Sequence, residues 1–360
     1  TGYQKSHVAA TAKHFPGHGD TNVDSHYGLP IIDHDLETLH NVDLKPFKAA
    51  IKAGIDAIMP GHIVVPALDD SGLPATLSKP ILTDLLRKEM KFNGVIITDS
   101  LGMSGANVVP PDRVAVEAFK AGADILLNPP NVPVAYEAVL NAVKSGEISK
   151  KRLEQSVYRI LELKFKRGLF HQPTMPEDAI NQIGLPENLD KADKITESSI
   201  TLVKNDQSAL PLNQEESVFI TGPSTGNPSM LSQMLGQKGF DSRVYETSAS
   251  PTASQIAEAV SRSQNADSII ITAYTANTNT AQQQLVKQLE QTGKKIIVAS
   301  MRNPYDILAF PEVDANILTY GFRPVSVKAL AKALSGELSP SGKLPVTIPG
   351  MYPYGHGLSY

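Results

Sequence analysis

The sequence predicts an α/β protein with two domains: half of a (β/α)8 barrel, then a helical connector, then an α/β sandwich. Four strand–loop–helix units follow one another in residues 1–146. Their strands are nearly continuous apolar runs, which is typical of parallel strands buried on both faces. A second series of alternating strands and helices occupies residues 199–360. Together these patterns predict two parallel sheets in one chain.

The four units of the first domain each consist of a strand, a loop and an amphipathic helix, and the first of these helices ends at Gly54. An open parallel sheet would show the same pattern. Polar residues at the carboxyl ends of the strands favour a barrel, because barrel enzymes place their active sites at that end. We expect the strands at residues 7–14, 56–63, 94–100 and 123–129.

Residues 147–198 are predicted to connect the two domains, because they contain two amphipathic helical segments on either side of a Pro-containing stretch. The tail at residues 341–360 is rich in Gly, Pro and Tyr and predicts an ordered loop. In the second domain we expect strands at residues 217–222, 242–246, 267–274, 294–301 and 315–321.

The composition excludes several classes of protein. The chain has no Cys, which rules out disulfides, thiol catalysis and Cys-based metal sites. A net charge of −4 argues against a nucleic-acid-binding protein, which would carry a basic face. The sequence has no apolar run long enough for a membrane-spanning helix. It also lacks a P-loop and a dinucleotide-binding glycine motif, so we expect no cofactor.

Asp99 ends the apolar strand GVIITDS and is the first candidate for chemistry. A carboxylate at this end of a barrel strand points into the mouth of the barrel. There it could act as a fixed nucleophile toward the anomeric carbon of a sugar. The alternative is that Asp99 caps the N-terminus of a following helix.

The second candidate is the loop of residues 13–30, which is dense in Lys, His and Asp. Asp24 and His26 are two residues apart, so on an extended loop both side chains fall on one face. Asp24 could then bond one imidazole nitrogen and prepare His26 for proton transfer. Lys13 and His14, at the end of the preceding strand, could bond sugar hydroxyls.

Two weaker readings of the polar residues remain open. The histidines and aspartates of the loop could bind a metal ion, but their spacing matches no familiar zinc motif, so we expect no metal site. His62 follows the next strand and could lie on the pocket rim as a substrate contact, or it could simply be hydrogen-bonded within the fold.

KHFPGHGDT followed by DSH, and then GVIITDSLGM, resemble the β-N-acetylglucosaminidase branch of glycoside hydrolase family 3. The tail resembles the closing segment of two-domain members. The resemblance implies that Asp99 is the nucleophile, and that His26 with Asp24 is the acid–base pair. It also implies that Lys13 and His14 are sugar-binding positions. The β-glucosidase branch usually places a Glu acid–base elsewhere and lacks this His–Asp loop.

The function expected from the resemblance is a retaining exo-β-N-acetylglucosaminidase that removes terminal β-linked N-acetylglucosamine from peptidoglycan fragments. The alternatives are a β-glucosidase or a β-N-acetylglucosaminide phosphorylase of the same family, or a non-catalytic carbohydrate-binding fragment. Two-domain members of this branch resemble secreted or cell-wall-associated bacterial proteins, so that location is expected.

Members of the family have a complete eight-unit barrel, whereas four units precede the connector here. The resemblance therefore implies that residues 1–146 are the second, C-terminal half of the barrel. It places the other half, with an Asp and an Arg that grip the sugar, upstream of residue 1. Half a barrel would leave strand edges unpaired and apolar faces exposed. We expect this missing N-terminal half to be the main partner of the chain.

Overall fold

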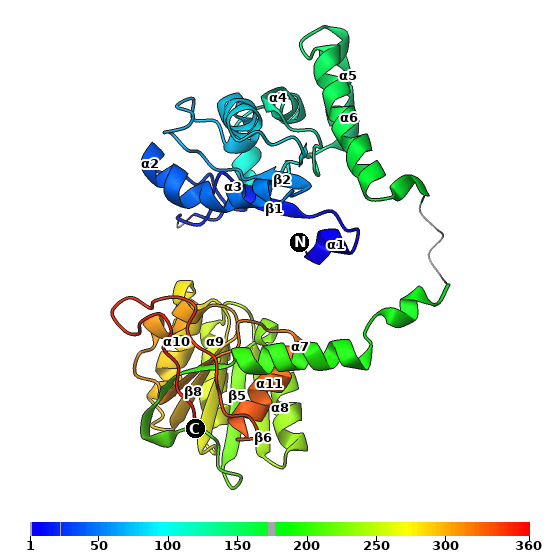
Figure 1. The fold of residues 1–360 in the computed structure, drawn as a ribbon. Helices are drawn as coiled ribbons and strands as arrows, with labels where there is room; N and C mark the ends of the chain where they lie inside the picture. The colour runs from blue at the N-terminus through cyan, green and yellow to red at the C-terminus, as the bar shows by residue number, and fades with distance from the viewer. Residues whose placement is uncertain (1, 22, 172–176) are drawn as a thin grey trace. The chain divides into compact units, whose positions relative to one another are not determined.

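The computed structural model describes residues 2–21, 23–171 and 177–360. The chain divides into two compact units, Thr1–Thr174 and Met175–Tyr360, and both are α/β in architecture. The connector predicted at residues 147–198 is divided between them, because its first helix belongs to the first unit and its second helix to the second (Figure 1). Along the described ranges, no helix is both long and apolar enough to cross a membrane.

The first unit contains a parallel sheet in which sequence order and spatial order agree. Its strands are β1 (Thr11–Phe15), β2 (Ala57–Pro60) and β3 (Val95–Ile96), in the order β1-β2-β3. A parallel bridge between Ile97 and Ile125 continues the series at the position of the fourth predicted strand. The first strand was predicted at residues 7–14, but it starts at Thr11 and follows a short helix, α1 (Gly2–Lys5).

The helices of the first unit pack their apolar faces on this sheet around Phe15, Ile58 and Ile96, all of which are fully buried. Side-chain caps fix the starts of two long helices, since Asn131 accepts from the Val134 N–H and Ser149 from the Arg152 N–H. The helical elements are α2 (Leu36–Thr38), η1 (Leu39–Asp43), α3 (Lys45–Lys52), η2 (Ala75–Leu77), η3 (Pro80–Glu89), η4 (Ser104–Ala106), α4 (Val114–Ala121), α5 (Val132–Lys144), α6 (Lys150–Lys166) and η5 (Leu169–His171).

Helix α6 is attached to the amino ends of the strands by two buried aspartates. Asp124 precedes the Ile97–Ile125 bridge, and its fully buried carboxylate accepts from Ser156 Oγ at 2.6 Å and from Arg159 at 3.1 Å, both on α6. The same carboxylate accepts from the Ile96 N–H of β3 at 3.0 Å and pairs with Arg87 of η3. One side chain thus joins a strand and two helices.

Asp56, just before β2, is the second attachment point. Its side chain is also fully buried, and it binds Lys166 Nζ at 3.0 Å and the Arg167 guanidinium at the end of α6. Burial raises the pKa of Asp56, but the hydrogen bonds from Lys166 and Arg167 outweigh this and hold it below its usual value. The carboxylate therefore stays charged and keeps its two cations.

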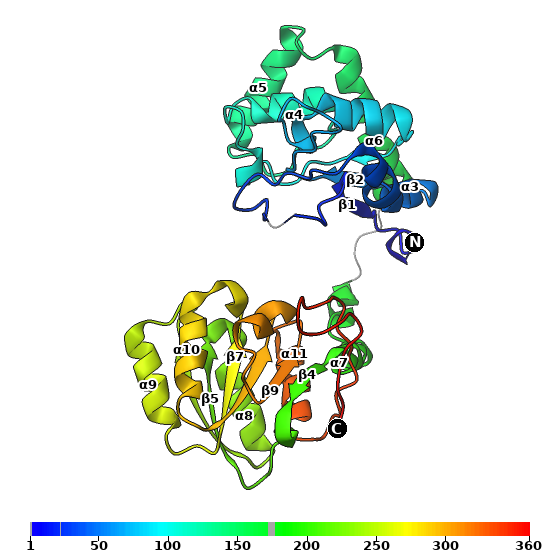
Figure 2. The same cartoon turned by 90° about the vertical axis from the view of Figure 1, so that its left-hand side faces the viewer.

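The second unit is a six-stranded sheet in the order β4-β9-β8-β7-β5-β6, parallel except for β4, which runs antiparallel to β9. Neighbouring residues of its strands face opposite sides: Ile270 packs with Leu231 of α8 and Leu330 of α11, whereas Ile269 packs with Leu285 of α10. Helices therefore cover both faces of the sheet (Figure 2).

The strands of the second unit are β4 (Thr201–Asn205), β5 (Ser217–Pro223), β6 (Asp241–Thr247), β7 (Ser268–Ala273), β8 (Lys295–Ser300) and β9 (Ala315–Leu318). The helices are η6 (Glu177–Gln182), α7 (Pro186–Ser199), η7 (Asp206–Ser208), η8 (Ser224–Gly226), α8 (Pro228–Gln237), α9 (Ala253–Ser263), η9 (Ala276–Thr278), α10 (Thr280–Glu290), η10 (Pro304–Ala309) and α11 (Pro324–Leu334).

The tail after Gly342 is ordered, as predicted, and it packs along β4. Leu358 forms an antiparallel bridge with Leu202, and His356 Nε2 donates to the Val203 carbonyl at 2.8 Å. The ring of Tyr352 stacks on His356 with 4.5 Å between centroids. These contacts give a segment without regular secondary structure a fixed path across the sheet edge.

The buried Asp124 cluster yields a stability prediction. We expect Asp124→Ala to lower the free energy of unfolding by about 3–5 kcal/mol, because it leaves the buried cations around it without their counter-charge. The matched control is Asp84→Ala on η3, where the carboxylate is 43% exposed and bonds Lys79 and Lys88. The control should cost about 1 kcal/mol or less. Urea unfolding followed by circular dichroism measures both, and equal losses would contradict the assignment.

Candidate active site

The predicted site residues of the first unit lie at the carboxyl ends of its parallel strands. His14 is the second-last residue of β1, His62 follows β2, and Asp99 follows β3. Because these strands are parallel neighbours, their ends share one edge of the sheet. His14 Nε2 lies 3.4 Å from Asp99 Oδ2, so residues 85 positions apart in the sequence meet there.

Asp99 is held by the backbone of the next residue, and its side chain is buried only in part. Its Oδ1 accepts from the Ser100 N–H at 2.8 Å, and the side chain is 17% exposed. No helix begins at Asp99, since the next helical turn, η4, has Met103 at its N-cap position and no side-chain cap. The helix-cap alternative is therefore not what the structure shows, and the second carboxylate oxygen faces His14.

His14 is half-buried beside Asp99, and burial lowers its pKa despite the attraction of the Asp99 carboxylate. The charge of Lys13 on the adjacent residue acts in the same direction as burial. Near neutral pH His14 is consequently an uncharged imidazole, able to donate from one nitrogen and accept at the other. Lys13 itself is exposed, and the register of β1 against β2 shifts between Lys13 and Phe15.

Asp24 and His26 form a hydrogen-bonded pair on the loop after β1. Asp24 Oδ1 accepts from His26 Nδ1 at 2.7 Å and from the His26 backbone N–H at 2.9 Å. These two bonds, the backbone bond first, lower the pKa of Asp24. A carboxylate only accepts, so Nδ1 carries a proton and Nε2 is the atom that can exchange one. The His26 side chain is 67% exposed.

A second set of contacts ties this loop to the Asp99 end of the sheet. Ser25, which lies between Asp24 and His26 in the sequence, is buried, and its hydroxyl is 3.0 Å from His18 Nε2. The His18 ring in turn packs edge-on against His14, with 5.9 Å between centroids. The Gly105 N–H, in η4 after Asp99, donates to the Ser25 carbonyl at 3.3 Å. His18 and Ser25 were not predicted as site residues, although His18 stood in the polar loop.

His62 is fully buried, with both ring nitrogens bonded within the fold. Nε2 donates to the Ser100 carbonyl at 2.9 Å, and Nδ1 lies 2.9 Å from Thr76 Oγ1. Burial lowers the pKa of His62, so the neutral ring donates to Ser100 through Nε2 and leaves Nδ1 as an acceptor. Nδ1 shares the Thr76 hydroxyl with the Gly61 carbonyl, which lies 3.0 Å from Thr76 Oγ1. This is the alternative that the sequence left open, and it makes His62 a support for the segment after Asp99 rather than a residue on the pocket rim.

Among the residues that the structure describes, no group of three His, Asp or Glu side chains is arranged to hold a metal ion. His14 and Asp99 are in contact at the carboxyl ends of the strands, and the bond from the Gly105 N–H to the Ser25 carbonyl links the loop of Asp24 and His26 to the segment after Asp99.

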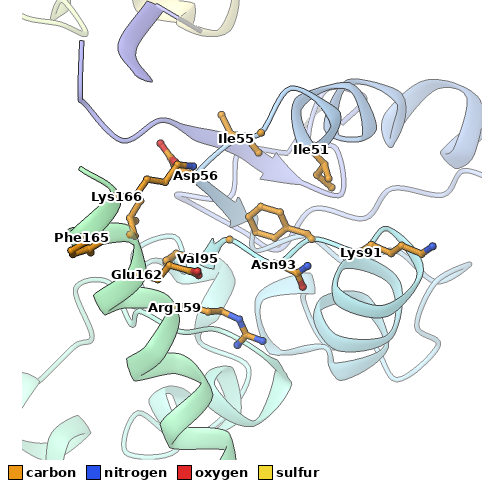
Figure 3. Close-up of a pocket in the computed structure, with 14 residues that line it drawn as sticks. Ile51, Ile55, Asp56, Lys91, Asn93, Val95, Arg159, Glu162, Phe165 and Lys166 are labelled. Atoms are coloured by element: carbon orange, nitrogen blue, oxygen red, sulfur yellow. The ribbon is translucent and has the colours of Figure 1, made fainter. Parts of the chain in front are cut away.

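A cavity of about 640 Å³ lies at the opposite, amino end of the strands (Figure 3). Asp56 precedes β2, Asn93 and Val95 introduce β3, and Glu162 and Lys166 come from α6. Active sites on parallel α/β folds lie at the carboxyl ends of strands. We therefore assign this cavity to the packing of α6 and not to the chemistry.

Comparison with known proteins agrees with this arrangement. Residues 1–163 match the glycosyl hydrolase family 3 N terminal domain, and residues 200–360 match the glycosyl hydrolase family 3 C-terminal domain. The chain is 29% identical over 379 residues to a β-N-acetylglucosaminidase/β-glucosidase of Cellulomonas fimi, which covers 95% of this chain and 66% of that protein.

Two solved structures are similar over nearly the whole chain. A glycoside hydrolase family 3 β-N-acetylglucosaminidase from Paenibacillus sp. str. FPU-7 gives a TM-score of 0.87 at 33% identity, covering 97% of this chain and 68% of that one. A β-glucoside phosphorylase gives a TM-score of 0.82 at 26% identity, covering 97% and 67%.

A parallel sheet with carboxylates and imidazoles at the carboxyl ends of its strands, followed by a second α/β unit, defines a two-domain α/β protein whose candidate site lies in the first unit. The chain belongs to glycosyl hydrolase family 3, a family of glycoside hydrolases. The resemblance seen in the sequence is thereby confirmed. The chain spans about two thirds of the length of these relatives.

The hydrogen bonds of His62 lead to a second prediction. We expect His62→Ala to lower the free energy of unfolding by about 2 kcal/mol or more, because the Ser100 carbonyl loses its donor and a cavity opens in place of the fully buried ring. His40→Ala is the control, since His40 is only partly buried and bonds the exposed Lys48 amine. If the two substitutions have the same effect in urea unfolding, His62 does not support this end of the sheet.

Proposed function

We propose that this chain carries the catalytic half of a retaining exo-β-N-acetylglucosaminidase. The observation that supports the proposal most strongly is the Asp24–His26 pair, in which the bond to Nδ1 leaves Nε2 for proton transfer. Most glycosidases use two carboxylates instead. An imidazole in this role would distinguish the site from the common arrangement.

In the first proposed step the Asp99 carboxylate attacks the anomeric carbon, and the bond from this carbon to the leaving oxygen breaks. His26 Nε2 delivers its proton to that oxygen, so the aglycone departs as a neutral alcohol. Asp24 stabilises the imidazolium before transfer through the 2.7 Å bond to Nδ1. The products of this step are a glycosyl ester on Asp99 and a neutral His26.

In the second step the neutral His26 accepts a proton from water as the water oxygen attacks the anomeric carbon. The ester bond breaks, which restores the Asp99 carboxylate, the protonated imidazole and a sugar with its original configuration. We further propose that Lys13 and His14 bond the sugar hydroxyls, because both stand at the end of β1 and His14 is in contact with Asp99.

N-acetylglucosamine is the sugar we propose, because the Cellulomonas fimi relative and the Paenibacillus structure are both named β-N-acetylglucosaminidases. Peptidoglycan fragments are the proposed source of the β-linked residue. The Cellulomonas fimi protein is also named a β-glucosidase, so glucosides form the comparison substrate in any test.

Phosphorolysis is a second candidate activity, and the similarity to a β-glucoside phosphorylase favours it. A neutral imidazole repels an approaching anion less than a carboxylate base would. Phosphate could then replace water in the second step and release sugar-1-phosphate from Asp99.

We also propose that the open face of the first unit is covered by the missing N-terminal half of a (β/α)8 barrel. Within the described ranges β1 is paired on one side only, and Ile125 ends the strand series at the other edge. An apolar cavity of about 680 Å³ lies between α5 and α6. Large apolar side chains are exposed on both helices, at Val132 (63%), Tyr136 (65%), Tyr158 (66%) and Phe165 (68%).

Exposed apolar surface of this kind marks an interaction site. Three parallel strands and the parallel Ile97–Ile125 bridge, all in sequence order, correspond to half of the eight strands that close such a barrel. A second set of four strand–helix units would cover the two open edges of the strand series and the exposed apolar side chains of α5 and α6.

The reaction is tested with nitrophenyl N-acetyl-β-glucosaminide beside the matching glucoside, with and without phosphate. We expect turnover of the first substrate, lowered about 10³-fold or more by Asp99→Ala and about 10²–10⁴-fold by His26→Ala. Sugar-1-phosphate among the products would establish phosphorolysis. Sugar binding that survives Asp99→Asn, without turnover by the unmodified protein, would instead favour a carbohydrate-binding function.

The open face predicts an association that can be measured. We expect the 360-residue chain to form a 1:1 complex with the segment that precedes the matched region in the Paenibacillus protein, and turnover to appear or rise on mixing. Light scattering gives the stoichiometry, and Tyr136→Lys together with Phe165→Lys should abolish the complex. Full activity of the chain alone, with no complex formed, would contradict this proposal.

A further inference from the structure

His34 lies between two carboxylates at the base of the loop that carries Asp24 and His26. Its Nδ1 is 2.8 Å from Asp43 Oδ2, and its Nε2 is 2.8 Å from Asp20 Oδ2. Carboxylates only accept hydrogen bonds, so two such bonds require a proton on each ring nitrogen. The geometry is that of an imidazolium ion bridging two carboxylates.

The surroundings of His34 favour this charged form. The hydrogen bond to Asp43 raises the pKa of His34, and the bond to Asp20 raises it further. The hydrogen bond from the Thr38 N–H, by which Asp35 caps α2, lowers the pKa of Asp35, and the charge of His34 lowers it further. The charged groups in contact with the imidazole thus come from η1 and from the loop, and both are acidic, as is Asp35 at the start of α2.

Asp43 fixes this loop at a second point. The backbone of Gly17 has φ of +147°, and a Cβ placed there would lie 2.9 Å from the Asp43 Cβ. The loop therefore passes directly against Asp43 at Gly17, and it is bonded to Asp43 again through His34 and Asp20. The Asp43 side chain is only 7% exposed, whereas that of Asp20 is 78% exposed. Buried Asp43 is therefore the fixed point, and exposed Asp20 belongs to the loop that is held in place.

We propose that His34 is a positioning residue, whose bridge from Asp43 to Asp20 holds the loop so that the Asp24–His26 pair meets the leaving oxygen of a glycoside bound at Asp99. This role rests on the proposed function. Asp20 precedes Asp24 by four residues, so an extended loop that loses its bond at Asp20 can displace the pair by more than the tolerance of proton transfer. His34 itself touches neither substrate nor Asp99.

The pH dependence follows from the direction of the shift. Because the pKa of His34 is raised, the bridge is complete at low pH and is lost as the pH rises through that pKa. Deprotonation removes one of the two donors, and the exposed Asp20 is then the partner released. Proton transfer by His26 should weaken over that interval while attack by Asp99 does not.

The experiment compares two aryl N-acetyl-β-glucosaminides, one with a phenyl leaving group that needs protonation and one with a dinitrophenyl group that does not. It uses the active protein, with its N-terminal half where activity requires it. We expect His34→Gln to lower kcat/KM for the phenyl substrate about 10- to 100-fold and to leave the dinitrophenyl substrate unchanged. His34→Arg, permanently charged and rich in donors, should restore the phenyl rate toward that of the unmodified protein.

The matched control is His40→Gln on the neighbouring η1, which should leave both rates unchanged. Equal losses with both substrates, or no loss with either in His34→Gln, would overturn the positioning role. Amide exchange of the loop supplies a readout that does not depend on turnover. Protection at residues 17–21 and 23–26 should fall with rising pH in the unmodified protein and persist in His34→Arg; identical profiles in the two would overturn the proposal even if the enzyme proved inactive.

Discussion

The attachment of α6 to two buried aspartates is the constraint on which the rest of the first unit depends. Taking a carboxylate and its cations out of water costs several kcal/mol per ion, and it is tolerated only where further hydrogen bonds complete the site. Asp124 meets this condition with partners on α6, η3 and β3. Asp56 meets it with the last turn of α6. An apolar contact could have supplied similar stability, but these directional bonds also fix the rotation and height of the helix against the strands.

This arrangement separates the two ends of the sheet by function. At the amino ends every buried charge is balanced, and the cavity beside them is lined by residues committed to holding α6. At the carboxyl ends the polar groups are only partly satisfied: His14 is neutral beside Asp99, and His26 bonds Asp24 through one nitrogen. His62 lies between these categories, because it is at the carboxyl end but is buried and fully bonded. Its hydrogen bond holds the Ser100 carbonyl, and thereby the neighbouring Asp99.

Much of the fold could be predicted from the sequence because its strands are short apolar runs that end in recognisable loops. Asp99 and the Asp24–His26 pair were predicted in the same way, since each stands in a distinctive local motif. The roles of His62 and His34 depend on partners that no local pattern reveals: Thr76 and Ser100 for the first, and Asp20 and Asp43 for the second. The connector was also harder to predict, because the anchoring of α6 depends on Asp56 and Asp124, far upstream of it.

The two halves of the proposed catalytic machinery differ in exposure for a physical reason. A nucleophile must lie within bonding distance of one carbon atom, and Asp99 is accordingly short, mostly buried and held by the backbone of the next residue. A general acid that later acts as a base must serve two different oxygens in turn, that of the aglycone and that of water. An exposed imidazole on a loop can do this, but a loop free to move is poorly positioned in either step. The bridge from Asp43 through His34 to Asp20 holds the loop at its base, and buried Ser25 holds it beside the pair, while the His26 ring itself stays exposed. A held backbone with an accessible imidazole is what the two-step reaction requires.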